Sequence, residues 1–397
     1  MSLSPPIVIG LMTDRKAWLV CSVALQRFRD VETKLPLVVF NVSVLPDVAV
    51  AAIPLLGATL VSLEPHMPVF GASRPHIRMG NGRETAWNKL ALWAQPFNKI
   101  IFVDVDTLLL HNIDHMAEFP RDTFAPEVCS WPPCVESAIA SGINTGVMVI
   151  GPSRQTFRAM ATFAEEVDAI IQATPANEIR SSHTGTFLNL CPIKSSLARN
   201  LSPPSRSLCS FCRKLGLRYF GSTDQSFIRE FFSQRRHISI TVPHRRRQGW
   251  DWSYRTFESA EPCSATEHGR DGNMNCSSRR ANVMSRLYNA RPLDCERCPA
   301  TYAPKIVHYS CVVKPWQRTR WQWASRTHCA NNRTTGDCAP CALKWIQQWF
   351  AAADRMCDTV IGIDGYAAYA RTQDMAGNIL GTRSKAADHP RSSLCKG

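Results

Sequence analysis

The sequence predicts an α/β fold built on a doubly wound sheet. Strand and helix patterns alternate from residue 5 onward, one of the apolar strands ends in a pair of aspartates, and the composition, 45% hydrophobic and 20% charged, is that of a globular protein. A chain of 397 residues can form one large domain or two ordinary ones. The alternation favours one continuous layered domain.

The first part of the chain supplies most of the expected sheet. We expect strands over residues 7–12, 37–42, 59–63, 100–103 and 142–150, and helices over residues 15–29, 47–56, 84–94 and 153–172. The strand over 100–103 is β-branched and aromatic between polar residues, as is typical of a buried parallel strand. Ligands of open α/β sheets bind at the carboxyl ends of such strands. Functional residues are therefore expected just after them.

The regular alternation fails in two later segments. Residues from about 174 to 218 accumulate Pro, Ser and Cys, and those from about 248 to 303 accumulate Arg, Ser, Asn and Cys. We interpret both as Cys-rich insertions within one domain that spans residues 5–320. A helical pattern returns over 223–232 and a strand pattern over 305–308.

Residues 321–397 form a C-terminal extension outside the α/β alternation. Apolar residues at Leu343, Ile346 and Phe350 predict an amphipathic helix over 341–356 that packs across the core.

Asp104 and Asp106 follow the strand over 100–103. In extended chain, residues two apart leave the same face, so the two carboxylates converge while Val105 points into the core. Two carboxylates on one face repel each other unless a cation lies between them, and oxygen ligands favour Mg(II) or Mn(II). The alternative is a solvated pair of loop aspartates that caps the next turn.

Three further segments place polar side chains where such a sheet binds ligands. They contribute Asn144 and Thr145 at a strand start, Asp224 and Gln225 at a helix start, and His308 and Lys314 at and after a strand end. Each has a structural alternative, because a strand-end histidine is often satisfied within a core and a lysine before Pro-Trp can lie on the surface.

Taken in this order, the four segments resemble glycosyltransferase family 8, the glycogenin-like retaining sugar transferases. The resemblance covers most of residues 7–320 apart from the two insertions. It implies a GT-A fold, the Rossmann-like fold of nucleotide-diphospho-sugar transferases, with a mixed central sheet. It also implies that a hexose or related sugar moves from a UDP-sugar donor to a glycan or protein acceptor, with the donor's stereochemistry retained.

The resemblance assigns a role to individual residues. Asp104, Asp106 and His308 would coordinate Mn(II), with Mg(II) as the alternative, since an oxygen-rich set with one imidazole suits Mn(II). Asp224, Gln225 and Lys314 would act at the reacting centre, Lys314 by stabilising the charge on departing UDP. Contacts to the donor are implied for Leu11, Thr13, Asp14, Lys89, Asp104, Val105, Asn144, Thr145, Gly146 and Lys314. Asp14 could also cap the helix that follows it.

Two residues depart from the family pattern. Gly221 stands where an acidic residue is frequent, and Cys311 where glycine is usual. They keep open the alternative of a catalytically weak or inactive relative that binds a sugar nucleotide or a glycan.

The charge and the cysteines bear on partners. A net charge of +14 suits an anionic partner such as a nucleotide-linked donor. The arginine run at residues 244–248 has no zinc-finger, RRM or helix-turn-helix pattern around it, so no nucleic-acid partner is expected. Cysteine pairs at 209 and 212, 295 and 298, and 338 and 341 have the spacing of zinc half-sites, which would make a zinc-ribbon nucleic-acid-binding protein the alternative. We favour disulfides that staple the insertions.

Sixteen cysteines and four Asn-x-Ser/Thr sequons favour the Golgi or another secretory lumen. Against this, we expect no signal peptide and no membrane anchor in this sequence, which makes the cytoplasm the alternative. Nothing in the sequence specifies an oligomeric state.

Overall fold

The computed structural model describes four long stretches of the chain, residues 5–64, 83–126, 143–173 and 340–360. It also describes short segments at 180–181, 187–189, 220–221, 224–233, 238–239, 254–256, 258–259, 282–284, 286–292, 304–309 and 314–317. The cysteine pairs at 209 and 212 and at 295 and 298 and the arginine run lie outside the described residues. The boundaries of the domain and of its insertions stay predictions.

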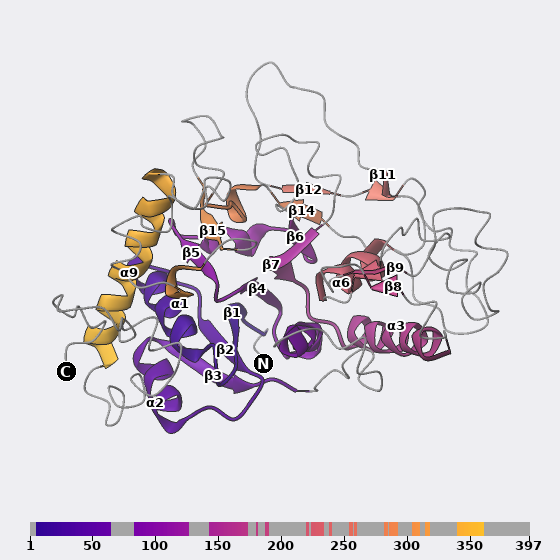
Figure 1. Cartoon of the computed structure of the whole chain (residues 1–397), viewed down its shortest axis with the longest axis horizontal. Coiled ribbons are helices and arrows are strands. Elements are labelled where there is room, and N and C mark those ends of the chain that lie inside the picture. The colour runs from indigo at the N-terminus through magenta and orange to yellow at the C-terminus, as the bar shows by residue number, and fades with distance from the viewer. Residues whose placement is uncertain are drawn as a thin grey trace, which may run out of the picture.

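An eight-stranded sheet forms the centre of the protein, in the order β12-β14-β6-β7-β4-β1-β2-β3 (Figure 1). Its strands are β1 (Ile7–Thr13), β2 (Leu37–Asn41), β3 (Ala58–Ser62), β4 (Lys99–Val103), β6 (Thr123–Pro126), β7 (Ile143–Ile150), β12 (Tyr254–Thr256) and β14 (Asn282–Met284). The neighbours β3, β2, β1 and β4 are parallel, whereas β7 is antiparallel to both β4 and β6. The α/β class and the mixed sheet expected of a GT-A fold are confirmed.

Shorter strands lie beside this sheet. β5 (Thr107–Leu109) pairs antiparallel with β15 (Ile306–His308). The others are β8 (Arg180–Ser181), β9 (Phe187–Asn189), β10 (Phe220–Gly221), β11 (Ile238–Ser239) and β13 (Glu258–Ser259).

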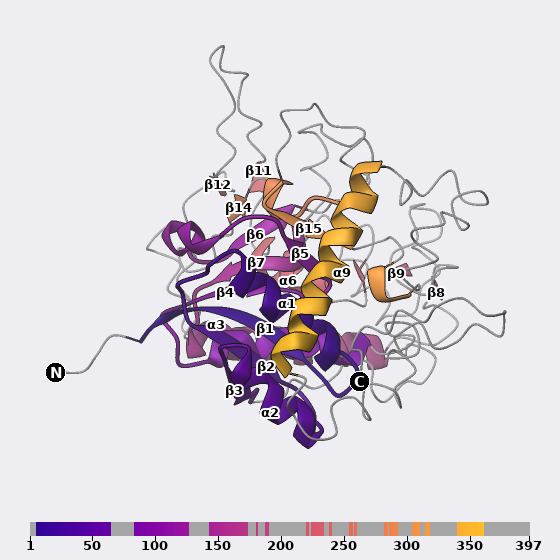
Figure 2. The same ribbon diagram turned by 90° about the vertical axis from the view of Figure 1, so that its left-hand side faces the viewer.

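Helices cover both faces of the sheet because its central strands are apolar on both sides. In β4, Ile101 and Val103 belong to one hydrophobic cluster, and Ile100 and Phe102 belong to the other. The first cluster includes residues of α1 (Trp18–Asp30), α2 (Asp47–Leu55) and α9 (Pro340–Val360), and the second includes residues of α3 (Arg154–Ala173), α6 (Asp224–Ser233) and the 3₁₀ segment η2 (Arg83–Ala94). Figures 1 and 2 show α9 lying along α1. Three further 3₁₀ segments are η3 (Asp114–Glu118), η6 (Arg286–Tyr288) and η7 (Pro315–Gln317).

Two expectations about local structure need correction. Residues 84–94 form 3₁₀ turns rather than an α-helix. The segment is not amphipathic either, because its apolar residues are buried on every side instead of on one face: Trp87, Leu90, Ala91, Leu92 and Trp93 are all fully buried. Strands β5 and β6 were not expected, since three or four residues are too few for a period to be recognised.

The expected C-terminal helix is α9, and it is anchored to α1. Trp349 and Phe350 lie in the core, and the Arg355 guanidinium donates two hydrogen bonds to the Asp30 carboxylate, at 3.0 and 2.6 Å. Asp30 also pairs with Arg27, whose Nη2 donates to the carbonyl of Leu109 on β5 at 2.6 Å. The extension is therefore tied to the strand next to the aspartate pair.

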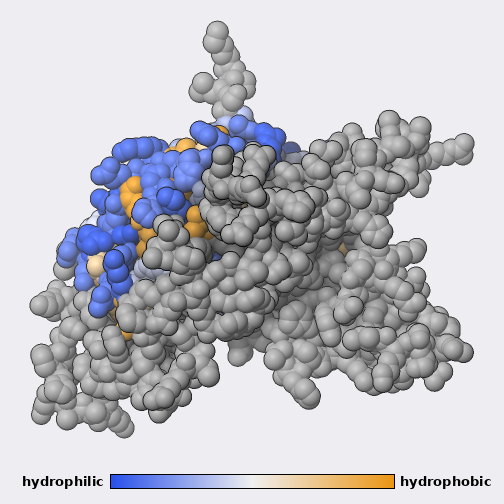
Figure 3. Space-filling model, turned by 90° about the horizontal axis from the view of Figure 1, so that it is seen from above, coloured by the Kyte–Doolittle hydropathy of each residue, from blue (hydrophilic) through white to orange (hydrophobic). Residues whose placement is uncertain are grey.

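The described surface offers few apolar areas. Seen from above it is mainly hydrophilic (Figure 3), and the large hydrophobic side chains exposed in the described ranges are Val44, Val50 and Leu55, on and beside α2. No helix in these ranges is both long enough and apolar enough to cross a membrane. Of the two cysteine side chains described, Cys21 is a buried free thiol and Cys357 is disulfide-bonded.

Candidate metal centre

Asp104 and Asp106 lie in the tight turn between β4 and β5, which corrects the expectation that they continue an extended strand. The Thr107 hydroxyl closes the turn by donating to the Asp104 carbonyl at 2.7 Å, and the Asp104 amide ties the turn to β7 by donating to the Gly146 carbonyl at 2.7 Å. The chain turns here because β5 leaves β4 to pair with β15. Val105 packs against the core, as expected.

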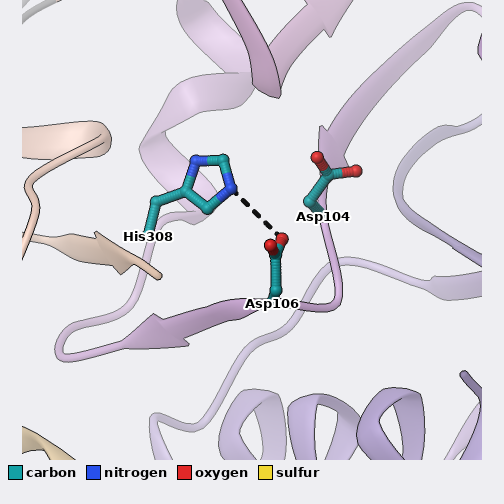
Figure 4. Close-up of side chains that lie close together, drawn as sticks. All are labelled: Asp104, Asp106 and His308. Atoms are coloured by element: carbon teal, nitrogen blue, oxygen red, sulfur yellow. Dashed lines mark hydrogen bonds and ion pairs between the residues drawn. The ribbon is translucent and has the colours of Figure 1, made fainter. Parts of the chain in front are cut away.

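His308 reaches the aspartates through that strand pair. The β5–β15 register sets His308 opposite Thr107, next to Asp106, although 202 residues separate His308 from Asp106. His308 Nε2 lies 3.1 Å from Asp106 Oδ1, and one ligand atom from each of Asp104, Asp106 and His308 lies within 4.8 Å of the others. Figure 4 shows the imidazole and the Asp106 carboxylate turned toward each other, with Asp104 alongside.

The other ring nitrogen of His308 contacts a residue that the sequence reasoning missed. Asn289 Oδ1 lies 2.8 Å from His308 Nδ1, and Asn289 is fully buried. Asn289 falls in the segment interpreted as the second insertion, yet β14 of the same segment belongs to the central sheet. The only sign of Asn289 in the sequence was its polar amide side chain between Tyr288 and Ala290, shortly before the strand predicted over 305–308.

Two lysines flank the aspartates. The Lys314 ammonium pairs with Asp106 Oδ2. Lys89, almost fully buried, donates to Asp104 Oδ2 at 2.8 Å and lies 3.4 Å from Asp224 Oδ2. Burial works to lower the pKa of Lys89, but the carboxylates of Asp104 and Asp224 raise it overall, so Lys89 stays charged.

The two carboxyl groups differ in their protonation. Burial opposes ionisation of Asp106, yet electrostatic interactions and hydrogen bonds with His308 and Lys314 hold its pKa far below the usual range. Burial raises the pKa of Asp104, and the Asp106 charge adds to the rise despite the opposing effect of Lys89. Such crowding of carboxylates is relieved by a divalent cation, and two carboxylates with one imidazole suit Mn(II). The residues present therefore fit a divalent cation.

A cluster of hydrogen-bonded polar side chains lies next to this centre, where β7 meets the start of α6. The Thr145 hydroxyl donates to Asp224 Oδ2 at 2.7 Å, and Asn144 Nδ2 donates to Gln225 Oε1 at 3.0 Å. The Gly146 amide donates to Asn144 Oδ1 at 2.8 Å, which fixes that side chain. Through Lys89, these residues are connected to Asp104.

The expected nucleotide contacts lie at the same edge of the sheet, since β1 and β4 are parallel neighbours. The side chains of Leu11 and Thr13 are buried in β1. Asp14 Oδ1 accepts hydrogen bonds from the amides of Lys16 and Ala17, each at 2.8 Å, so Asp14 does cap the turn that leads into α1.

The two departures from the family pattern lie close in sequence to this site. Gly221 is in β10, which pairs with β9 just before α6. Cys311 lies outside the described residues.

Comparisons with known proteins find partial similarity. No family model matches the chain. A segment is 36% identical over 84 residues to a putative UDP-glucuronate:xylan alpha-glucuronosyltransferase 3 of Arabidopsis thaliana, covering 20% of this chain and 12% of that protein. Glycogenin-1 of Mus musculus is 35% identical over 79 residues, covering 20% of this chain and 21% of glycogenin-1. The matches thus span about a fifth or less of these relatives' length.

Solved structures resemble the chain weakly. An active-site mutant of LgtC has a TM-score of 0.44 at 10% identity, with 87% of this chain and 95% of that chain covered. The sequence matches are the closer comparison, and over the matched fifth of its length this chain resembles the glycogenin-like glycosyltransferases, as its motifs indicated.

Proposed function

We propose that this protein is a glycosyltransferase that moves a hexose or related sugar from a UDP-sugar to a glycan or protein acceptor, with retention of configuration and with Mn(II). The observation that carries the proposal is the convergence of Asp104, Asp106 and His308 within 4.8 Å. The group lies at the carboxyl end of a central strand, where α/β sheets bind their ligands.

The three convergent residues would hold the cation, with Mg(II) as the alternative to Mn(II). Bound there, the cation supplies positive charge to the donor diphosphate. Asp106, held ionised by its interactions with His308 and Lys314, is the stronger anionic ligand. His308 contributes the imidazole that favours Mn(II) over Mg(II).

Lys314 and Lys89 are proposed to have different roles, one at the departing phosphate and one beside the sugar. Lys314, about a quarter exposed, would stabilise the charge that grows on the β-phosphate as UDP leaves. Lys89 is buried between Asp104 and Asp224 and would hold the Asp224 carboxylate in place beside the sugar.

Asp224 and Gln225 would face the anomeric carbon, with Asn144 and Thr145 lining the sugar pocket. Their mutual hydrogen bonds set the side chains before a substrate enters, which is how orientation lowers a barrier. In the reaction, the bond from the anomeric carbon to the UDP oxygen breaks, and the acceptor oxygen bonds to the same face. The hydroxyl proton passes to the departing phosphate.

The remaining donor contacts are proposed at the end of β1. Leu11 and Thr13 would meet uracil and ribose through their backbone, since their side chains are buried, and Asp14 would combine ribose binding with its capping role. Val105, within the aspartate turn, and Gly146, on β7 beside the turn, would contribute backbone groups to the donor site.

We also propose that the protein works in the secretory lumen with its cysteines in disulfides. Sixteen cysteines and the disulfide-bonded state of Cys357 support this. Mass spectrometry of the unreduced protein is expected to find several cross-linked peptides. Free thiols together with stoichiometric zinc would contradict it and favour the zinc-ribbon alternative.

A screen of UDP-sugars with Mn(II) tests the proposed function. Binding and UDP release are measured for each donor with a panel of glycan acceptors, and the anomeric configuration of the product is determined by NMR. We expect at least one donor to release UDP, with Asp104→Asn losing this activity. The control Asp47→Asn, which removes an exposed carboxylate on α2, should retain it.

Two outcomes of the screen would count against the proposal. An absence of binding by every UDP-sugar would refute it. Binding without turnover would favour the inactive relative, which the departures at Gly221 and Cys311 keep open.

A further inference from the structure

We infer that Asn289 is a positioning residue that keeps the ring proton of His308 on Nδ1 and thereby presents Nε2 to the cation. The inference rests on the proposed cation site and names a residue outside the three ligands. Its starting point is the contact between two buried side chains, Asn289 Oδ1 and His308 Nδ1, at 2.8 Å.

The chemistry of this contact requires a proton on Nδ1. A side-chain carbonyl oxygen carries no proton to donate, so a hydrogen bond at 2.8 Å requires the proton on Nδ1. With the proton on Nε2 alone, two lone pairs would face each other at that distance. The nitrogen across the ring, Nε2, points at Asp106 and is the atom that lies in the ligand group.

The backbone around Asn289 holds its side chain in register with β15. The His308 amide donates to the Ala290 carbonyl at 2.7 Å, and the Lys305 amide donates to the Leu287 carbonyl at 2.7 Å. The preceding residue is fixed as well, because the Tyr288 hydroxyl lies 2.7 Å from His115 Nε2. Asn289 is thus anchored on both sides, so its amide does not have to be ordered when a cation binds.

The contact with Asn289 raises the affinity of His308 for a cation because it disfavours a proton on Nε2, which would compete with the cation. Without an acceptor at Nδ1, the neutral ring is free to place its proton on Nε2 and donate it to Asp106 Oδ1, 3.1 Å away. In that tautomer, Nε2 has no lone pair to offer the cation. Groups that orient metal-bound histidines in this way typically contribute about 10- to 100-fold in metal affinity.

Two substitutions and a matched control test the inference. Asn289→Leu removes the acceptor at similar size, and Asn289→Asp keeps an acceptor oxygen at the same place. The control is Asn112→Leu, since Asn112 donates to the carbonyls of Val31 and Glu32 away from the site, and its loss reports on general destabilisation.

Mn(II) affinity, measured by electron paramagnetic resonance on the folded full chain, is the first readout. We expect Asn289→Leu to bind Mn(II) about 10- to 100-fold more weakly than the parent. Asn289→Asp and Asn112→Leu should bind at close to the parent affinity. Parent-like affinity in Asn289→Leu, or no rescue in a folded Asn289→Asp, would overturn the inference.

The protonation of Nδ1 is the second readout. Nitrogen NMR of ¹⁵N-histidine-labelled, metal-free protein, recorded at a pH where imidazole is neutral and with His308 identified by its absence in His308→Gln, should show the ring proton on Nδ1 in the parent but not in Asn289→Leu. An unprotonated Nδ1 in the parent, or the same tautomer in Asn289→Leu, would overturn the inference. The proposed cation site and the role of Asn289 fail separately: a parent that binds no Mn(II) refutes the cation site, whereas the NMR comparison of the parent with Asn289→Leu decides the role of Asn289.

Discussion

Gly146 on β7 lies against the imidazole of His308: a Cβ built on Gly146 would be 2.3 Å from His308 Cε1 and 2.6 Å from Nδ1. The same Cβ would lie 2.8 Å from Asn144 Oδ1. These distances are far below van der Waals contact, so the absence of a side chain at 146 is what admits the histidine. The Asn-Thr-Gly motif therefore shapes the candidate metal centre as well as the proposed sugar pocket.

Gly146→Ala is expected to weaken Mn(II) binding at least about tenfold, because the ring must move away from Asp106. The measurement is a Mn(II) titration of both proteins. Gly57→Ala is the control: nothing lies within 4 Å of its added Cβ, but its φ of +82° is strained for alanine. It should cost about 1 kcal/mol of stability and leave Mn(II) binding intact. Equal Mn(II) affinity in Gly146→Ala and the parent would show that His308 is not seated as described.

Lys89→Met is expected to destabilise the fold by about 3–5 kcal/mol, because Asp104 and Asp224 lose their buried counter-ion. Urea unfolding measures the cost. Added Mn(II) should restore part of the loss, since a cation at the site neutralises Asp104.

The matched control for this prediction is Lys99→Met. The Lys99 ammonium donates to the carbonyls of Ala117 and Phe119, at 2.5 and 2.7 Å. Its loss should cost about 1.5–3 kcal/mol and show no recovery with Mn(II). A similar recovery in both variants would contradict the proposed coupling of Lys89 to the metal centre.

Asp122 gives the fold a pH dependence. Burial raises the pKa of Asp122 to about 7, against the hydrogen bonds that it accepts from Gly151 and Trp93. The folded protein thus retains this proton after the unfolded chain has lost it near pH 4, and the stabilisation fades as the pH rises from about 4 to 7. Between pH 5 and pH 8, the group should lower the free energy of unfolding by about 2–3 kcal/mol.

Asp122→Asn tests this dependence, since asparagine also tolerates the φ of +56° found there. Urea unfolding at pH 5 and pH 8 should show a smaller difference in the variant than in the parent. Asp47→Asn, at an exposed position, should keep the parental difference. An unchanged pH dependence in Asp122→Asn would refute the raised pKa.

Much of the fold was predictable because its central strands are apolar on both faces. The runs that became β1, β2, β4 and β7 are continuous in sequence, and local pattern is enough to find them. The 3₁₀ geometry of η2 was not predicted, since the spacing of apolar residues over so short a segment does not distinguish a 3₁₀ segment from an α-helix. Nor was the turn at Asp104, which depends on β15, some two hundred residues away.

The candidate site was predictable in its membership but not in its connections. The family resemblance indicated Asp104, Asp106 and His308, and the structure brings them together. It did not indicate that Lys89 joins Asp104 to Asp224, nor that Asn289 contacts His308, because side-chain pairs between distant segments leave no local pattern.

The stoichiometry of Mn(II) bound by the purified protein tests the central claim most directly. Equilibrium dialysis should find one Mn(II) per chain in the parent and in Asp47→Asn, and none at the same Mn(II) concentration in Asp106→Asn, whose ligand set has lost its ionised carboxylate. No bound Mn(II) in the parent, or unchanged binding in Asp106→Asn, would contradict a metal centre at Asp104, Asp106 and His308.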